Sequence, residues 1–226
     1  EVAAALAAGR PVVALESALV THGFAYPDNL VITRRMAAAI REAGAVPALV
    51  AIWQGVPTVG LPADAWEGLA ADREAIKVSV RDLGTAALRA VADGVNGGTT
   101  VAATSILAQR AGIQVFATGG IGGVHRGHPE DVSADLPALA RTPIVVVCAG
   151  AKSILDLPRT LEFLETWGVP VVGWGTDEFP AFYSRRSGLP VDIPVADAAE
   201  VAAIVAARRE LDLPQAVLVT VPIAAV

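Results

Sequence analysis

The chain has 226 residues, of which 54% are hydrophobic and 18% are charged, so it contains ample apolar material for one large core. Its 17 basic and 23 acidic residues give a formal charge of −6, and no run of Lys and Arg forms a basic stripe, which argues against a nucleic-acid partner. No apolar stretch approaches the roughly 20 residues of a membrane span, and no signal pattern is found. One cysteine excludes an intrachain disulfide, so we expect a protein of the reducing cytoplasm.

Short β-branched runs alternate with Ala-rich segments of helical period, which is typical of strands that feed crossover helices. In chain order, the predicted elements are strand Pro11–Leu15, helix Asn29–Ala43, strand Ala48–Gln54, helix Ala63–Ala71, strand Ile76–Val80, helix Arg81–Ala92, helix Thr100–Ala111, strand Gln114–Thr118, helix Leu136–Arg141, strand Ile144–Ala149, helix Leu157–Trp167, strand Val169–Trp174, helix Ala196–Glu210 and strand Ala216–Val221. Because the strands are apolar on both faces, helices or neighbouring subunits should cover both sides of the sheet. The pattern predicts a three-layer α/β/α fold with a largely parallel or mixed central sheet, in a single catalytic domain over residues 1–226. A closed eight-fold barrel is the alternative, although the irregular spacing fits it poorly.

Polar residues that follow apolar strands are the candidate functional residues, because ligands bind beyond the carboxyl ends of strands in open α/β sheets. Glu16 directly follows the first strand, and burial there would favour its protonated form and suit it to general acid or base catalysis. A helix-capping or ion-paired glutamate is the alternative interpretation. Lys152 follows the apolar run that ends at Ala149, where partial desolvation would favour a neutral amine able to attack a carbonyl. An ordinary surface lysine is the alternative there.

Three further segments carry polar groups of interest. Thr118–Gly127 contains four glycines before His125 and Arg126, a composition that suits an anion nest but is also typical of a tight turn. Gly97–Thr100 is predicted to open a helix and offers hydroxyls and amides to an anion.

Asp131–Asp135 places two carboxylates four residues apart, which suits a hard divalent cation, unless Asp135 simply caps the following helix. Lys77 is either a strand-flanking charge or a phosphate contact. The three histidines show no metal-ligand spacing.

Together these segments resemble one family, the pseudouridine-5'-phosphate glycosidases, also called the indigoidine-synthase-A-like family. The resemblance runs collinearly from about Pro11 to the end of the chain. It rests on the runs Ala14–Ser17, His22–Gly23, Tyr26–Pro27, Gly98–Thr104, Thr118–Gly127, Asp131–Leu136, Cys148–Asp156, Thr160–Thr166 and Phe179–Phe182.

The resemblance implies an α/β/α homotrimer that cleaves pseudouridine 5'-phosphate to uracil and ribose 5-phosphate with Mn2+ or another hard divalent cation, an activity of the carbon–oxygen lyase class. By position, Glu16 matches the proton donor, Lys152 the nucleophile that forms a Schiff base, and Asp131 the metal ligand. The matching or expected substrate-binding residues are Lys77, Thr99, Thr100, His125, Ser133, Ala134 and Asp135. Family members continue through a segment with a substrate-binding asparagine that has no counterpart here, so we expect the chain to lack that C-terminal segment and a few N-terminal residues.

Two other functions fit the same residues. A Schiff-base sugar-phosphate aldolase would also place a reactive lysine after a strand, but it would release two carbonyl products and no uracil. An inactive sugar-phosphate-binding paralogue would bind ligand without turnover. We expect a small-molecule substrate in each case, with no nucleic acid and no membrane as partners.

Overall fold

A computed structural model describes residues 1–84 and 94–224, and these fall into two compact units, Glu1–Phe116 and Ala117–Val226. The boundary lies within strand β6 (Val115–Ala117), and each unit is described by itself. The predicted helix Arg81–Ala92 falls largely outside the described residues. That the whole chain is a single catalytic domain stays a prediction.

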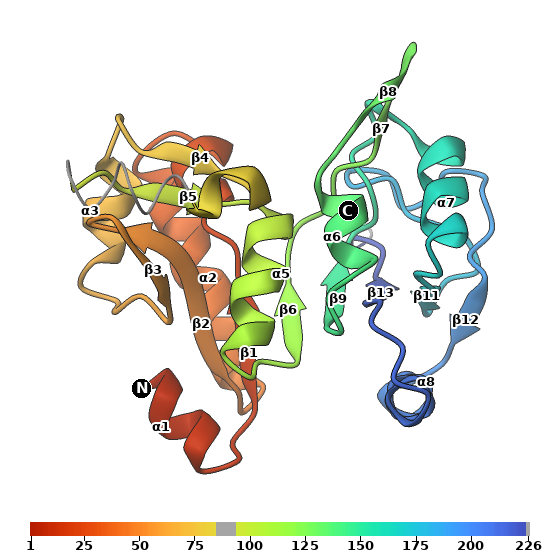
Figure 1. The fold of residues 1–226 in the computed structure, drawn as a ribbon, viewed down its shortest axis with the longest axis horizontal. Helices are drawn as coiled ribbons and strands as arrows, with labels where there is room; N and C mark the ends of the chain where they lie inside the picture. The colour runs from red at the N-terminus through yellow and green to blue at the C-terminus, as the bar shows by residue number, and fades with distance from the viewer. Residues whose placement is uncertain (85–93, 225–226) are drawn as a thin grey trace. The chain divides into compact units, whose positions relative to one another are not determined.

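The N-terminal unit is built around a mixed sheet with the strand order β1–β2–β5–β4 (Figure 1). Its strands are β1 (Val12–Leu15), β2 (Val46–Trp53), β3 (Val56–Val59), β4 (Ile76–Val78) and β5 (Gly97–Thr99). β1 pairs with β2 and β4 with β5 in parallel, whereas β2 pairs with both β3 and β5 in antiparallel fashion.

Helices cover both faces of this sheet, as the burial of its longest strand shows. Every residue of β2 from Val46 to Ile52 is buried, so neither face of the strand meets solvent. The helices α2 and α5 both contact β2. Among the described residues, the helical segments of the unit include α1 (Val2–Ala7), the π-helical turn η1 (Leu19–Gly23), α2 (Asp28–Glu42), α3 (Trp66–Ala71) and α5 (Val101–Arg110).

The C-terminal unit contains a parallel sheet with the strand order β12–β11–β13–β9. Its strands are β9 (Val145–Cys148), β11 (Val171–Trp174), β12 (Ile193–Val195) and β13 (Val217–Thr220), and its helices are α6 (Asp135–Leu139), α7 (Leu157–Thr166) and α8 (Ala198–Glu210). A second, antiparallel sheet has the order β10–β7–β8, formed by β7 (Val124–His125), β8 (His128–Val132) and β10 (Leu155–Asp156). All four residues of β13 are buried, which explains its continuous apolar sequence.

The predicted α/β/α fold with a largely parallel or mixed central sheet is confirmed, and each of the seven predicted strands overlaps an observed one. Within residues 1–84 and 94–224, none of the helices combines the length and the apolar character that crossing a bilayer requires. Among the described residues, the sequence prediction missed α1, η1, β3, β5, β7, β8, β10 and β12.

Candidate active site

Glu16 lies at the carboxyl end of β1, where the parallel pairing of Leu15 with Leu49 of β2 ends. Val12, Ala14 and Leu15 of the strand are buried, and Glu16 itself is half-buried. The sequence predicted burial of this carboxylate, and the structure places it next to the apolar interior with part of its surface in contact with solvent. A proton donor needs both features, because it must exchange protons with water and still act in a partly desolvated site.

Next to Glu16, the hydroxyl of Ser17 ties three segments of the chain together. Ser17 is fully buried, and its Oγ donates to the carbonyl of Val50 over 2.6 Å. The same oxygen accepts from the amide of Thr99 over 2.9 Å. The hydroxyl of Thr99 also donates to Val50, over 2.7 Å, and lies 2.8 Å from that of Thr104. This network fixes the residue after Glu16, and it was not anticipated from the sequence.

We expect Ser17→Ala to lower the free energy of unfolding by about 1–3 kcal/mol, because the buried Thr99 amide loses its acceptor. Ser105→Ala is a matched control, since that buried hydroxyl donates to the carbonyl of Val101 within its own helix. Urea denaturation with an unchanged m-value measures both losses. Equal losses in the two variants would contradict a special role for the Ser17 network.

The secondary structure of Gly97–Thr100, the expected anion-binding segment, differs from the prediction. Gly97–Thr99 is strand β5 rather than the start of a helix, because its backbone pairs with both β2 and β4. The hydroxyl of Thr99 is buried and bonded as described above. Helix α5 begins at Val101, and the hydroxyl of its N-cap Thr100 accepts from the amide of Ala103 over 3.4 Å. Both threonines thus have a local structural role in addition to the predicted substrate contact.

Lys77 lies in β4 directly opposite Gly98 of β5, and it is exposed. The imidazole of His22, at the end of η1, has its pKa lowered from the ordinary value, first by partial burial and second by the positive charge of Lys77. The hydroxyl of Thr21 lies 2.6 Å from Nδ1 of His22. The lowered pKa favours the neutral imidazole, so the exposed ammonium group of Lys77 is the charge at this edge of the unit that suits an anion such as a phosphate.

In the C-terminal unit, a lysine-bearing loop runs beside the glycine-rich loop. The Lys152 loop (residues 149–155) follows β9, and the Gly-rich loop (residues 119–123) follows β6. The amide of Ala149 donates to Gly119, the amide of Ile121 donates to Gly150 over 3.0 Å, and the amide of Lys152 donates to Ile121 over 3.4 Å. These hydrogen bonds form one ladder between the two loops, and they fix the backbone of Lys152 against the Gly-rich loop.

The side chain of Lys152 is exposed, which corrects the expectation that it is partly desolvated. The physical reason is that β9 ends at Cys148, and residues 149–151 then turn along the Gly-rich loop, so the lysine emerges on the loop surface.

The guanidinium group of Arg126 forms hydrogen bonds with the backbone of the Lys152 loop. Its Nε donates to the carbonyl of Leu155 over 2.9 Å, and its Nη2 donates to the carbonyl of Ser153 over 3.0 Å. The sequence suggested Arg126 as an anion ligand, whereas the structure uses at least two of its donors on the backbone. The folding of the loops decides which basic side chain faces a ligand, and no sequence pattern indicates this choice.

The expected substrate-binding stretch 133–135 packs against the same Gly-rich loop. Asp135 is 8% exposed, and its Oδ2 accepts from the amide of Gly122 over 2.8 Å. A Cβ on Gly122 would lie 2.2 Å from Oγ of Ser133, so only glycine fits there. Asp135 is the first residue of α6, and Ala134, which is exposed, is its N-cap without a side-chain bond. The structure thus brings Ser133, Asp135 and Lys152 together around one loop.

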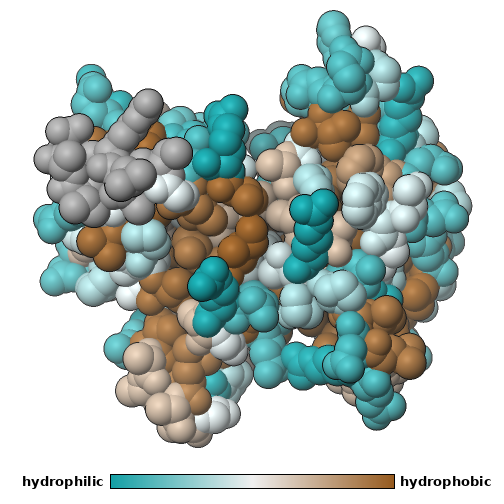
Figure 2. All heavy atoms as spheres, viewed as in Figure 1, coloured by the Kyte–Doolittle hydropathy of each residue, from teal (hydrophilic) through white to brown (hydrophobic). Residues whose placement is uncertain are grey.

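His125 and Asp131 lie on the β7–β8 hairpin, with 3.4 Å between Nδ1 and Oδ2. Both side chains are more than half exposed, at 52% and 64%, and the hairpin tip is hydrophilic in Figure 2. Among the described residues, no group of three or more His, Cys, Asp and Glu side chains is close enough to hold a metal ion. One carboxylate beside an imidazole fits a hard cation only if water or substrate oxygens supply most of its ligands.

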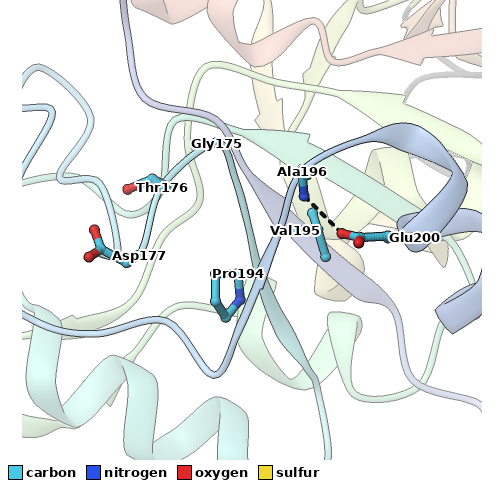
Figure 3. Close-up of a pocket in the computed structure, with 7 residues that line it drawn as sticks. All are labelled: Gly175, Thr176, Asp177, Pro194, Val195, Ala196 and Glu200. Atoms are coloured by element: carbon cyan, nitrogen blue, oxygen red, sulfur yellow. Dashed lines mark hydrogen bonds between the residues drawn. The ribbon is translucent and has the colours of Figure 1, made fainter.

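A pocket of about 510 Å³ lies beyond the carboxyl ends of β11 and β12, and none of the predicted site residues lines it (Figure 3). It is lined by Gly175, Thr176, Asp177, Pro194, Val195, Ala196 and Glu200. Oε2 of Glu200 accepts from the amide of Ala196 over 2.8 Å, one residue before Asp197, the N-cap of α8. Its two carboxylates, Asp177 and Glu200, would repel a phosphate, so we do not regard it as the substrate phosphate site.

The fold and the site define a class of protein. It is an α/β protein that binds its ligand beyond the carboxyl ends of the strands, because the candidate residues and the Gly-rich loop follow strands and helices cover both faces of the sheet. The family model described as "Indigoidine synthase A like protein" matches residues 1–226. The chain belongs to this family.

Individual relatives agree with that assignment. The chain is similar to a pseudouridine-5'-phosphate glycosidase of Methylobacterium nodulans, at 56% identity over 99% of this chain and 66% of that protein. It is also similar to the solved structure of the prealnumycin C-glycosynthase AlnA in complex with ribulose 5-phosphate, with a TM-score of 0.89 and 44% identity over 99% of this chain and 72% of that one. An indigoidine synthase A-like protein of Thermotoga maritima gives a TM-score of 0.88 at 38% identity, over 96% of this chain and 72% of that one. The chain thus spans about two thirds to three quarters of the length of these relatives.

Proposed function

We propose that this protein is a pseudouridine-5'-phosphate glycosidase, which cleaves the bond between C1' of ribose 5-phosphate and C5 of uracil. The observation that carries the proposal is the 56% identity, over nearly all of this chain, to a protein of that name. The ribulose 5-phosphate complex of AlnA supports it, because a pentose 5-phosphate binds to a protein of the same fold.

In the proposed reaction, Glu16 starts the sequence by giving a proton to the ribose ring oxygen. The electron pair of uracil N1 moves through the ring to form a double bond between C5 and C1', and the bond between C1' and the ring oxygen breaks. A carbon leaving group departs poorly, so this ring opening prepares C1' for attack. The half-buried position of Glu16 after β1 supports this role.

Lys152 then adds through Nζ to C1', and the electron pair returns to the base. After C5 is protonated, the nitrogen lone pair forms an imine with C1', the C1'–C5 bond breaks, and uracil leaves. Water hydrolyses the imine to ribose 5-phosphate and the free amine. The fixed backbone and exposed side chain of Lys152 support this role, since a nucleophile must be held in place and still be reached by substrate.

The remaining assignments rest on the family resemblance and on local chemistry. We propose that Lys77 contacts the phosphate, and that Asp131, beside His125, holds a hydrated Mn2+ that would supply positive charge for substrate oxygens. We further propose a homotrimer that acts in the cytoplasm.

Incubation with pseudouridine 5'-phosphate and Mn2+, followed by chromatography, tests the proposal. We expect uracil and ribose 5-phosphate in equal amounts, loss of turnover with EDTA, and recovery when Mn2+ is added back. Two carbonyl products without uracil would indicate the aldolase instead. Ligand-induced thermal stabilisation without any product would indicate a binding protein.

A further inference from the structure

The segment of residues 179–184, which we call the Phe182 loop, lies on the Lys152 loop and the Gly-rich loop within the C-terminal unit. The amide of Phe182 donates to the carbonyl of Ala149 over 2.9 Å. An isolated antiparallel bridge joins Ala181 to Gly150. Because Lys152 is two residues beyond Gly150, the Phe182 loop is held beside the backbone that carries the proposed nucleophile.

The backbone of Phe182 is strained. Its φ of +58° lies in the left-handed region, which an aromatic L-residue rarely adopts. Such conformations persist only where the surroundings enforce them, and they gather at functional sites.

The neighbouring loops have glycine where the Phe182 loop makes its closest approaches. A Cβ on Gly120 would lie 2.5 Å from Cδ2 of Phe182, and a Cβ on Gly150 would lie 1.8 Å from the carbonyl oxygen of Pro180. The ring of Phe182 therefore packs directly on the backbone of the Gly-rich loop.

This arrangement presents Tyr183 to solvent. The Tyr183 ring meets the Phe182 ring edge to face, with centroids 4.3 Å apart and an angle of 74° between the planes. The residue is 74% exposed, although tyrosine normally buries most of its ring. A strained support thus holds an uncovered aromatic ring beside residues 149–150, the start of the loop on which Lys152 also lies.

We propose that Tyr183 binds the uracil base of the substrate by stacking against it. The inference deepens the proposed function, on which it rests, by assigning a base-binding residue. A pyrimidine is a flat, uncharged π-system, and an exposed aromatic ring is the side chain that recognises one without a charge. A phosphate would instead require cations, which the tyrosine ring does not supply.

The test separates the base from the sugar phosphate. We measure kcat/KM for pseudouridine 5'-phosphate through uracil release, and in parallel the yield of the Lys152 adduct that borohydride traps with ribose 5-phosphate alone. Tyr183→Ala should lower kcat/KM by roughly ten-fold, mainly through KM, and leave the ribose 5-phosphate adduct at the wild-type yield. Tyr183→Phe, which keeps the ring, should recover most of the loss. Leu211→Ala removes an apolar side chain that is 70% exposed at the end of α8, and it should change neither readout.

An unchanged kcat/KM in Tyr183→Ala would overturn the inference while leaving the glycosidase intact. An equal loss of the ribose 5-phosphate adduct would overturn it too, since it would mean that Tyr183 shapes the Lys152 loop instead. A smaller assembly of Tyr183→Ala in light scattering would also overturn it, since the ring would then be an interface between copies. No uracil release by the wild-type protein would instead contradict the proposed function itself, and with it this inference.

Discussion

Replacing Lys152 by alanine is expected to lower kcat for uracil release by roughly 10³-fold or more, because the variant has no amine to form the imine. Lys152→Arg should be equally inactive, since arginine keeps the positive charge but stays protonated. The side chain is exposed, so both variants should melt within about 2 °C of the wild type. Loss of activity with retained folding then reports on chemistry rather than on stability.

The composition of the chain makes the site of attachment easy to map. The sequence contains only two lysines, Lys77 and Lys152. Borohydride trapping with ribose 5-phosphate should add one reduced sugar phosphate per chain, and peptide mapping should place it on Lys152. Lys77→Arg is the matched control, because it removes the other lysine amine and should leave the adduct on Lys152. An adduct that persists in Lys152→Ala and disappears in Lys77→Arg would reverse the proposed roles.

Several of the strands that sequence reasoning found are buried on both faces, although β4 has two exposed residues. β2 and β13 are continuous apolar runs because helices or neighbouring strands cover them completely. The missed strand β5 is Gly97-Gly98-Thr99, whose composition disfavours a strand, and it exists because Ala51, Ile52 and β4 pair with it. Pairing of that kind depends on partners far along the chain, which local patterns do not report.

In the candidate site, too, some features were predictable from the local sequence and others depend on distant parts of the chain. The positions of Glu16 and Lys152 were predictable, because a polar residue that ends an apolar strand marks the carboxyl edge of a sheet. The support of Lys152 by Arg126 was not predictable, since the bonds of Arg126 go to backbone carbonyls 27 and 29 residues away. The strained φ of Phe182 also left no trace in the sequence, because phenylalanine gives no sign of a left-handed backbone.

Glu16→Gln is expected to lower kcat for pseudouridine 5'-phosphate by about 10²–10⁴-fold with little change in KM. The amide has nearly the same shape as the carboxyl group, so substrate binding and folding should persist, but it has no proton to give to the ribose ring oxygen. Ribose 5-phosphate opens its own ring in water, so it should still form the Lys152 adduct in this variant. The variant therefore separates ring opening from imine formation.

Glu42→Gln is the matched control, because Glu42 is an exposed glutamate at the end of α2 in the same unit, and it should retain wild-type kcat. Equal turnover in Glu16→Gln and the wild type would contradict the proton-donor role. Loss of the ribose 5-phosphate adduct in Glu16→Gln would mean that Glu16 acts on the imine rather than on the ring oxygen. The expected pattern, in which turnover falls and trapping persists, assigns protonation to Glu16 and covalent attack to Lys152.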